Sequence, residues 1–354
     1  MKPKIAITPG DVNGVGYEII LKTLNEPHIL ELCTPIIYGS ARIAQIHRKT
    51  MDEIVVNLSP VNSPREAGDR KVSIINCNTD DIKVQFGRPA ADSALAAYQS
   101  LERACTDLDN GLVDAIVTAP INKQTIQSAD FHFPGHTEYL SSKFSIEGKE
   151  SLMMLVNGMM RVALVTNHMP ISQVSQAITQ DLIVSKLKAL NDSLCNDFSI
   201  RRPRIAVLAL NPHNGDDGLL GMEEKQVILP AIEQARQLGI CAFGTFSSDG
   251  FFGAAKYKDY DAILAMYHDQ GLIPFKALDM TGVNYTAGLR IVRTSPDHGT
   301  AFEIAGRNMA DEQSFRESIY LAVDVLNNRQ MNAEITSDSL PYTPLSHQPR
   351  QHNE

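Results

Sequence analysis

Three histidines of this 354-residue chain each follow an apolar run, and imidazole side chains in that position could bind a metal ion. The runs are 162–165, 205–210 and 262–266, and the histidines that follow them are His168, His213 and His268. Such runs are typical of strands buried on both faces of a parallel sheet, and ligands bind just outside the carboxyl ends of those strands. One such histidine alone would more often be a hydrogen-bonded core or loop residue. Three in the same context predict a three-histidine metal site.

The uncharged ligands of such a site determine its chemistry. Neutral imidazoles suit zinc, cobalt, nickel or iron better than magnesium. They leave the positive charge of the metal uncompensated, so that a substrate hydroxyl could ionise there and an alkoxide or enolate could be stabilised. Asp249 and Asp269 are candidates for carboxylates that support the ligands or move protons. Turn or helix-cap roles are an equally good interpretation of both aspartates.

A short segment at 134–138, with the sequence PGHTE, suits the recognition of a phosphate or a carboxylate. It combines a small residue with the donors and acceptors of His136, Thr137 and Glu138. The same segment is typical of a helix start with Thr137 as the N-cap. Both interpretations hold at once, because the N-terminus of a helix is itself an anion site.

Two further groups lie beyond the third apolar run. Lys276, Asn284 and Arg293 are expected on the loops that follow it, where they could form a clamp for a phosphorylated substrate beside the metal. Taken alone, lysines and arginines on surface loops are usually solvated. The segment 297–308 has a composition that could wrap an adenosine with backbone groups and Asn308, although generic loop chemistry would explain it equally well.

The elements that must position these residues alternate between strands and helices, which predicts an α/β/α fold. The predicted strands are 4–8, 35–38, 72–75, 114–117, 152–156, 161–165, 205–210, 239–243 and 262–266. The predicted helices are 18–24, 41–49, 92–107, 171–194 (broken), 223–238 and 314–327. Asn157-Gly158 predicts a hairpin within an otherwise parallel pattern. The glycines at 10–16 fit a strand-to-helix turn, but their spacing is not that of the G-x-G-x-x-G dinucleotide motif.

Composition restricts the class of protein. Hydrophobic residues make up 43% of the sequence and charged residues 21%, as in an ordinary globular protein. The net charge of −9 argues against nucleic acid or an anionic membrane as the main partner. The five cysteines show no C-x-x-C pair, which fits a reducing compartment. Without a signal-peptide region or an apolar run of ~18 residues, we expect a soluble, cytoplasmic protein.

Six motifs along the chain carry a family resemblance. They are ITPGD at 7–11, GHTEYL at 135–140, NH at 167–168, NPHNGDDGLLG at 211–221, AMYHDQGL at 265–272 and RTSPDHGTAFEIAG at 293–306. Together, and in this order, they resemble the 4-hydroxythreonine-4-phosphate dehydrogenase family of pyridoxal phosphate biosynthesis. The resemblance covers nearly the whole chain, from about Ile5 to Leu326.

The resemblance implies a fold like that of isocitrate and isopropylmalate dehydrogenases, with two interleaved α/β/α lobes in 1–330, a cleft between them and a polar tail over 331–354. It implies a homodimer that shares its active sites between subunits. The implied reaction is oxidation of a secondary alcohol of a small phosphorylated hydroxy acid by NAD (or NADP), followed by decarboxylation. A divalent metal ion (Zn, Co, Mg or Mn) is also implied.

The resemblance also assigns roles to residues. It makes His168, His213 and His268 the metal ligands, with His268 reaching into the partner's site. It places the substrate at His136, Thr137, Lys276, Asn284 and Arg293. It places the cofactor at His298, Gly299, Thr300, Ala301, Ile304 and Asn308. Lys276, Asp249 and Asp269 are the candidates for proton transfer and catalysis.

Some positions depart from the family pattern, and they concern the substrate. GDVNGVGYE at 10–18, GTFSSDG at 244–250 and LRI at 289–291 replace the usual segments. Relatives in the family oxidise 4-phosphorylated threonate or erythronate, so the same chemistry on a sugar acid is the first alternative. A three-histidine zinc hydrolase is the second, and it would not need the 293–308 loop. A non-catalytic sensor of phosphorylated ligands is the third.

Overall fold

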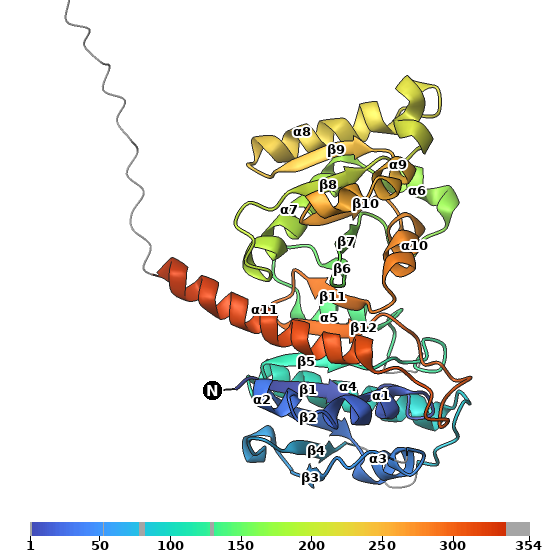
Figure 1. The fold of residues 1–354 in the computed structure, drawn as a ribbon, viewed down its shortest axis with the longest axis vertical. Coiled ribbons are helices and arrows are strands. Elements are labelled where there is room, and N and C mark those ends of the chain that lie inside the picture. Colours follow the sequence, from blue (N-terminus) through green and yellow to red (C-terminus); the bar gives the residue numbers. More distant parts are fainter. Residues whose placement is uncertain (1, 52, 78–81, 128–130, 338–354) are drawn as a thin grey trace, which may run out of the picture.

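A single twelve-stranded sheet runs through the computed structural model (Figure 1). The structure describes residues 2–51, 53–77, 82–127 and 131–337. The strands are β1 Lys4–Thr8, β2 Thr34–Gly39, β3 Leu58–Pro60, β4 Val72–Asn76, β5 Ala115–Thr118, β6 Leu152–Val156, β7 Arg161–Leu164, β8 Ile205–Leu208, β9 Ala242–Phe246, β10 Ala262–Ala265, β11 Val283–Ala287 and β12 Val292–Pro296. Their order across the sheet is β3-β4-β2-β1-β5-β12-β11-β6-β7-β10-β8-β9.

The strand directions divide this sheet into two halves. All pairings are parallel except β12 with β11, β11 with β6, and β6 with β7. The first half, β3 to β12, therefore meets the second half, β7 to β9, through a short antiparallel centre. The predicted α/β class with a mostly parallel mixed sheet is confirmed, and so is the predicted hairpin, which is β6 with β7. The prediction of two lobes in 1–330 stays a prediction.

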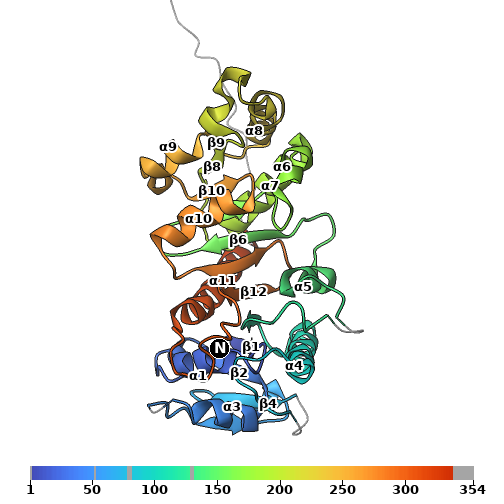
Figure 2. The ribbon, with the colours of Figure 1, turned by 90° about the vertical axis from the view of Figure 1, so that its right-hand side faces the viewer.

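Helices cover both faces of the sheet. Figure 2 shows α4 and α5 on one face of the first half, and α1 and α11 on the other. The α-helices are α1 Gly16–Leu24, α2 Ile29–Leu32, α3 Ala41–Arg48, α4 Ala91–Asp109, α5 His136–Phe144, α6 Ile171–Ala177, α7 Gln180–Asn196, α8 Leu229–Gln237, α9 Ser248–Gly253, α10 His268–Leu278 and α11 Gln313–Ser337. A π-helical turn, Glu224–Ile228, precedes α8, and single helical turns lie at Pro64–Glu66 and Lys256–Asp259. The segment Pro212–Gly218 is a turn whose residues 213–217 have positive φ angles.

The apolar runs form the central strands because both faces of the sheet are covered. Every residue of β5, β8 and β10 is buried, as expected for strands between two helical layers. The predicted break in the helix over 171–194 is confirmed, because α6 ends at Ala177 and α7 begins at Gln180 with Thr179 as its N-cap. Burial in the central strands fixes the strand ends, where the polar side chains lie.

Two predictions about the chain after β10 are wrong. Lys276 is not on a loop, because it lies in the last turn of α10, which begins at His268 and carries Asp269 in its first turn. Asn284 and Arg293 are not on loops either, since they belong to the hairpin of β11 and β12. The alternation of apolar and polar residues in VNYTA, the sequence of β11, is that of a strand.

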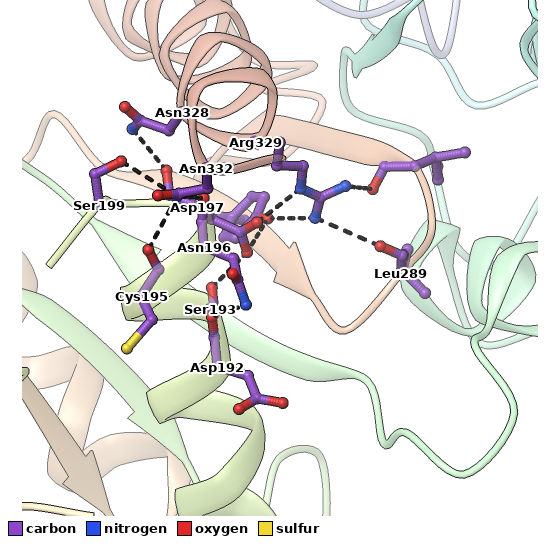
Figure 3. Close-up of polar contacts among 12 residues, drawn as sticks. Asp192, Ser193, Cys195, Asn196, Asp197, Ser199, Leu289, Asn328, Arg329 and Asn332 are labelled. Carbon is purple, nitrogen blue, oxygen red and sulfur yellow. Dashed lines mark hydrogen bonds and ion pairs between the residues drawn. The ribbon is translucent and has the colours of Figure 1, made fainter. Parts of the chain in front are cut away.

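The last helix is longer than predicted, because α11 continues to Ser337 instead of ending near Asn327. The predicted tail over 331–354 is therefore partly helical, and its residues from 338 onward lie outside the described part of the chain. Arg329 holds this part of the helix against the sheet. Its Nε lies 2.7 Å from Oδ1 of Asp197 (Figure 3). Its Nη2 lies 3.1 Å from the hydroxyl of Tyr285.

A buried histidine links the start of the chain to the packing beneath the 297–308 loop. His47 is 1% exposed, its Nε2 lies 2.8 Å from the carbonyl oxygen of Val12, and its ring packs against Tyr17 and Phe86. Burial lowers the pKa of His47 to about 4. An unfolded histidine titrates near pH 6.5, so between these two pH values only the unfolded chain binds the proton.

We therefore expect folding stability to fall as the pH drops from about 6.5 to about 4, with His47 contributing about 1.4 kcal/mol per pH unit. The His47→Gln variant keeps a hydrogen-bond donor but cannot titrate, so its stability should depend less steeply on pH. Urea unfolding at pH 7, 6 and 5 measures both slopes. Equal slopes in the variant and the parent chain would contradict this expectation.

Candidate active site

A cavity of about 340 Å³ lies where strand ends and helix starts from both halves of the sheet meet. Its chemistry-bearing residues are Thr118, Lys123, His136, Thr137, Glu138, Asn167, His168, His268, Lys276, Asn284, Arg293, Asp297, His298 and Gly299. Three of them are cations and two are carboxylates, in a chain whose net charge is −9. The cavity therefore offers the local positive site that an anionic substrate requires.

Arg293 is the most unusual residue of this cavity. It is 3% exposed, and its guanidinium donates to the hydroxyls of Thr118 (3.0 Å), Thr286 (3.2 Å) and Thr137 (3.4 Å). Burial lowers its pKa to about 10, against the opposing effect of the Glu138 charge, so the side chain stays cationic at neutral pH. Within the described chain no carboxylate forms an ion pair with it, and its Nε has no partner. A buried cation without a carboxylate partner indicates a binding site for an anionic ligand.

The hairpin of β11 and β12 explains how Arg293 reaches the cavity. Asn284 pairs with Ser295, so that Asn284, Thr286 and Arg293 share one face of the two strands. On the same cavity wall, Oδ1 of Asn284 and Oδ1 of Asn167 are buried without a hydrogen-bond partner in the described residues. Unsatisfied acceptors beside an unsatisfied donor indicate a site for a polar ligand with groups of both kinds.

The start of α5 forms a second wall. Gly135 is the N-cap residue and offers no side-chain cap, so the first amides of the helix face this end uncapped. The prediction of a helix start is confirmed, but Thr137 is not its N-cap, because it is the second residue of α5 and its hydroxyl accepts from Arg293. Burial, followed by the charges of Arg293 and Lys123, lowers the pKa of His136 to about 3. His136 is therefore neutral at neutral pH.

His168 and His268 lie side by side at the cavity, with ring centroids 5.7 Å apart. They follow β7 and β10, which are adjacent parallel strands. Burial, then Lys123 and His268, lower the pKa of His168, which favours the neutral imidazole that a metal ion needs. Nδ1 of His268 lies 2.7 Å from Oδ1 of Asp269, and a carboxylate there leaves Nε2 free to bind a metal.

His213 does not line this cavity. It is exposed on the turn Pro212–Gly218, whose residues 213–217 have positive φ angles. Asp249 is also exposed, and its pKa is lowered by the Ser247 hydroxyl, by the amide of Gly250 and, more weakly, by His213. In the part of the chain that the structure describes, no three His, Cys, Asp or Glu side chains are placed to hold a metal ion. One chain alone thus brings together His168 and His268, but not His213.

Lys276 lies on α10, and its Nζ is 3.1 Å from Oδ2 of Asp297. The sequence did not single out Thr118 or Asn167 as members of this site, whereas Glu138 belongs to the segment predicted to recognise an anion. Thr118 could have been found, because it ends the buried strand β5 in the same way as the histidines follow theirs. Asp297 was expected only as part of the 297–308 segment, and the pairing of β11 with β12 brings it to this cavity.

The segment 297–308 begins at the cavity, with His298 and Gly299 in its lining. Beyond them the chain turns away along α1, and the carbonyl oxygen of Thr300 accepts from the amide of Val15 at 3.1 Å. Ala301 and Asn308 have positive φ angles of 45° and 58°. The loop predicted to bind the cofactor therefore lies next to the cavity predicted to bind the substrate.

A larger hollow of about 680 Å³ lies between α7, α11 and the β11–β12 turn. Figure 3 shows Asp197, Arg329 and their neighbours along its wall. Its charged groups are largely matched, for example Arg329 with Asp197 and Lys149 with Asp192. It lacks the unpaired buried charge of the smaller cavity, so we assign the chemistry to the smaller one.

None of the helices in the described part of the chain has the length and hydropathy that a membrane span requires.

Comparisons with known proteins agree with the motifs. The model of the family described as "Pyridoxal phosphate biosynthetic protein PdxA" matches residues 31–322. The 4-hydroxythreonine-4-phosphate dehydrogenase of Bacteroides thetaiotaomicron is 54% identical over 330 residues, which are 93% of this chain and 90% of that protein. A protein of Oceanobacillus iheyensis with the provisional name D-threonate 4-phosphate dehydrogenase is 38% identical, over 92% of this chain and 98% of its own length.

A solved structure shows the same fold. The crystal structure of 4-hydroxythreonine-4-phosphate dehydrogenase from Klebsiella pneumoniae superposes with a TM-score of 0.80. It is 33% identical in sequence and covers 92% of this chain and 98% of its own. The family model, the relatives and the solved structure each span most of the chain. This chain therefore belongs to the family of the pyridoxal phosphate biosynthetic protein PdxA.

Proposed function

We propose that this chain oxidises and decarboxylates 4-phosphohydroxy-L-threonine with NAD and a divalent metal ion, giving 3-amino-2-oxopropyl phosphate and CO2. The observation that carries the proposal is the buried Arg293, which has no carboxylate partner among the described residues. It lies in a cavity that also holds the adjacent imidazoles of His168 and His268. A substrate with a phosphate, a carboxylate and a hydroxyl needs both kinds of group. The names of the relatives point to the same substrate.

The anionic end of the substrate has donors ready in the cavity. Arg293, Lys123 and the uncapped start of α5 line one region of it. Neutral His136 can donate to a phosphate oxygen or accept from a phosphate hydroxyl. Asn284 offers an acceptor without a partner, which suits a substrate hydroxyl or ammonium group. These groups hold the substrate in one orientation.

The donors present fit a divalent metal ion in part. His168 and His268 are adjacent and Asp269 orients the second of them, so both could act as ligands. A metal ion there would supply positive charge for the ionising hydroxyl of the substrate. A third histidine is lacking within one chain. We infer that His213 of a second copy completes the site, with its neighbour Asp249 beside it.

Proton transfer falls to Lys276, whose ammonium is held at the cavity by Asp297. In that position it can deliver a proton to the carbon that loses CO2. Residues 298–308 would hold NAD, which would supply the acceptor for the hydride of the substrate. In support of this assignment, His298 and Gly299 at the start of the loop line the cavity proposed for the substrate.

NADH formation with purified 4-phosphohydroxy-L-threonine, D-threonate 4-phosphate and D-erythronate 4-phosphate tests the substrate. We expect turnover of the amino acid, measured as absorbance of NADH with a metal-free sample as control. Turnover of a sugar-acid phosphate alone would favour the Oceanobacillus relative's named activity instead. Calorimetry with NAD tests the hydrolase and sensor alternatives, because a zinc hydrolase has no need to bind it.

A further inference from the structure

The ion pair between Glu18 and Lys22 holds one residue of the 297–312 segment by both of its backbone polar groups. Nζ of Lys22 lies 2.8 Å from Oε1 of Glu18, one helical turn away on α1. The same Oε1 accepts from the amide of Ala310 at 2.8 Å, and the same Nζ donates to the carbonyl oxygen of Ala310 at 2.7 Å. We call this pair the loop anchor.

The turn before α1 holds the other end of the same loop. The amide of Val15 donates to the carbonyl oxygen of Thr300 at 3.1 Å. A methyl group on Gly14 would lie only 2.7 Å from that oxygen, so the approach is close enough to need glycine. One short stretch of chain thus fixes Thr300 and Ala310, which flank residues 301–309, and these residues make up most of the 298–308 segment proposed to contact NAD.

Burial of the Glu18 carboxylate in the loop anchor is unfavourable for folding, and we explain it by the contacts that the anchor makes with the loop. Glu18 is 1% exposed, and its Oε2 is buried without a hydrogen-bond partner in the described chain. A buried carboxylate with an unsatisfied oxygen is unfavourable for folding. Between the two fixed ends the loop has exposed residues, including Met309 at 65%. Ala305 and Ala310 pack in the core, and the loop anchor adds polar contacts to the backbone of Ala310.

We propose that Glu18 and Lys22 are positioning residues for the dinucleotide. They keep 301–309 in the conformation that binds NAD, and neither lines the cavity of the substrate and the imidazoles. The inference rests on the proposed function, since the loop is assigned to NAD there. A loop that must be ordered by its ligand binds it more weakly, in proportion to the fraction already in the binding conformation.

The Lys22→Met variant tests the loop anchor. We expect KM and Kd for NAD to rise by about tenfold while kcat at saturating NAD and KM for the phosphorylated substrate change by less than about twofold. Lys22→Arg keeps the charge and should restore most of the affinity. Steady-state kinetics and calorimetry with NAD measure these constants, and hydrogen exchange should show faster opening of 301–310.

Arg103→Met is the matched control. Arg103 also pairs with a buried carboxylate one turn away, Asp107 on α4, on the opposite face of the sheet. This variant should leave the affinity for NAD unchanged. Equal affinity for NAD in Lys22→Met and the parent chain would overturn the inference. A fall in kcat together with a rise in KM for both NAD and the phosphorylated substrate would also overturn it. Failure of the parent chain to bind NAD would instead overturn the proposed function.

Discussion

The Arg293→Met variant should lose about a thousandfold in kcat/KM for the phosphorylated substrate while its folded state becomes no less stable. The loss follows because a buried charge that meets an anionic ligand contributes about 2–5 kcal/mol, and methionine supplies none of it. The stability is kept because the parent chain buries this cation without a carboxylate partner. An apolar side chain of similar length removes that desolvation cost.

Kinetics with both substrates and urea unfolding together measure these effects. Arg293→Lys is the companion variant, which keeps the charge but loses the guanidinium that donates to Thr118 and Thr286. Its kcat/KM should lie between those of the parent chain and of Arg293→Met. Arg161→Met, which removes a half-buried arginine packed on Phe198 away from the cavity, is the control and should keep full activity. A loss of stability as large as the loss of activity would show that Arg293 is a structural residue.

Mixing two inactive variants, His168→Ala and His213→Ala, should restore about a quarter of the parent activity, because half of randomly formed dimers are mixed and each mixed dimer has one intact site. The reason is geometric. His168 and His268 lie together in one chain, whereas His213 is exposed elsewhere, and we therefore propose that His213 comes from the second copy. In a mixed dimer one site then receives all three histidines.

The control pair separates this arrangement from the one that the family resemblance suggested. His168→Ala mixed with His268→Ala should recover nothing, because both changes fall on ligands that the same chain supplies. Recovery in this pair, with none in the first, would mean that His268 reaches into the partner's site instead. Subunits are exchanged by mild denaturation and refolding, and activity is compared with that of each variant alone.

Local patterns allowed much of the fold to be predicted. The apolar runs at 162–165, 205–210 and 262–266 became β7, β8 and β10, because burial on both faces leaves a continuous apolar signature. The hairpin at Asn157-Gly158 was equally local. The length of α11 was not, since Arg329 is held by Asp197, which is 132 residues away in the sequence.

The site was predictable by residue type but not by arrangement. The imidazoles of His168 and His268 meet because their strands are adjacent, a fact of topology that no local pattern contains. The turn Pro212–Gly218 takes His213 away through five successive positive φ angles, which residues other than glycine rarely adopt. Arg293 looked like a solvated cation until the pairing of β11 with β12 placed it inside the molecule.

The order of strands in the sheet also constrains how the chain is made. β5 ends at Thr118, but its neighbour β12 begins only at Val292, after every strand of the second half has been synthesised. At ~5–20 residues per second, β5 stays an unpaired edge on the ribosome for roughly 10–30 seconds. The first half of the sheet is therefore completed only when β12 and α11 have been synthesised. During that interval the nascent chain is most exposed to aggregation, and a chaperone would protect it most.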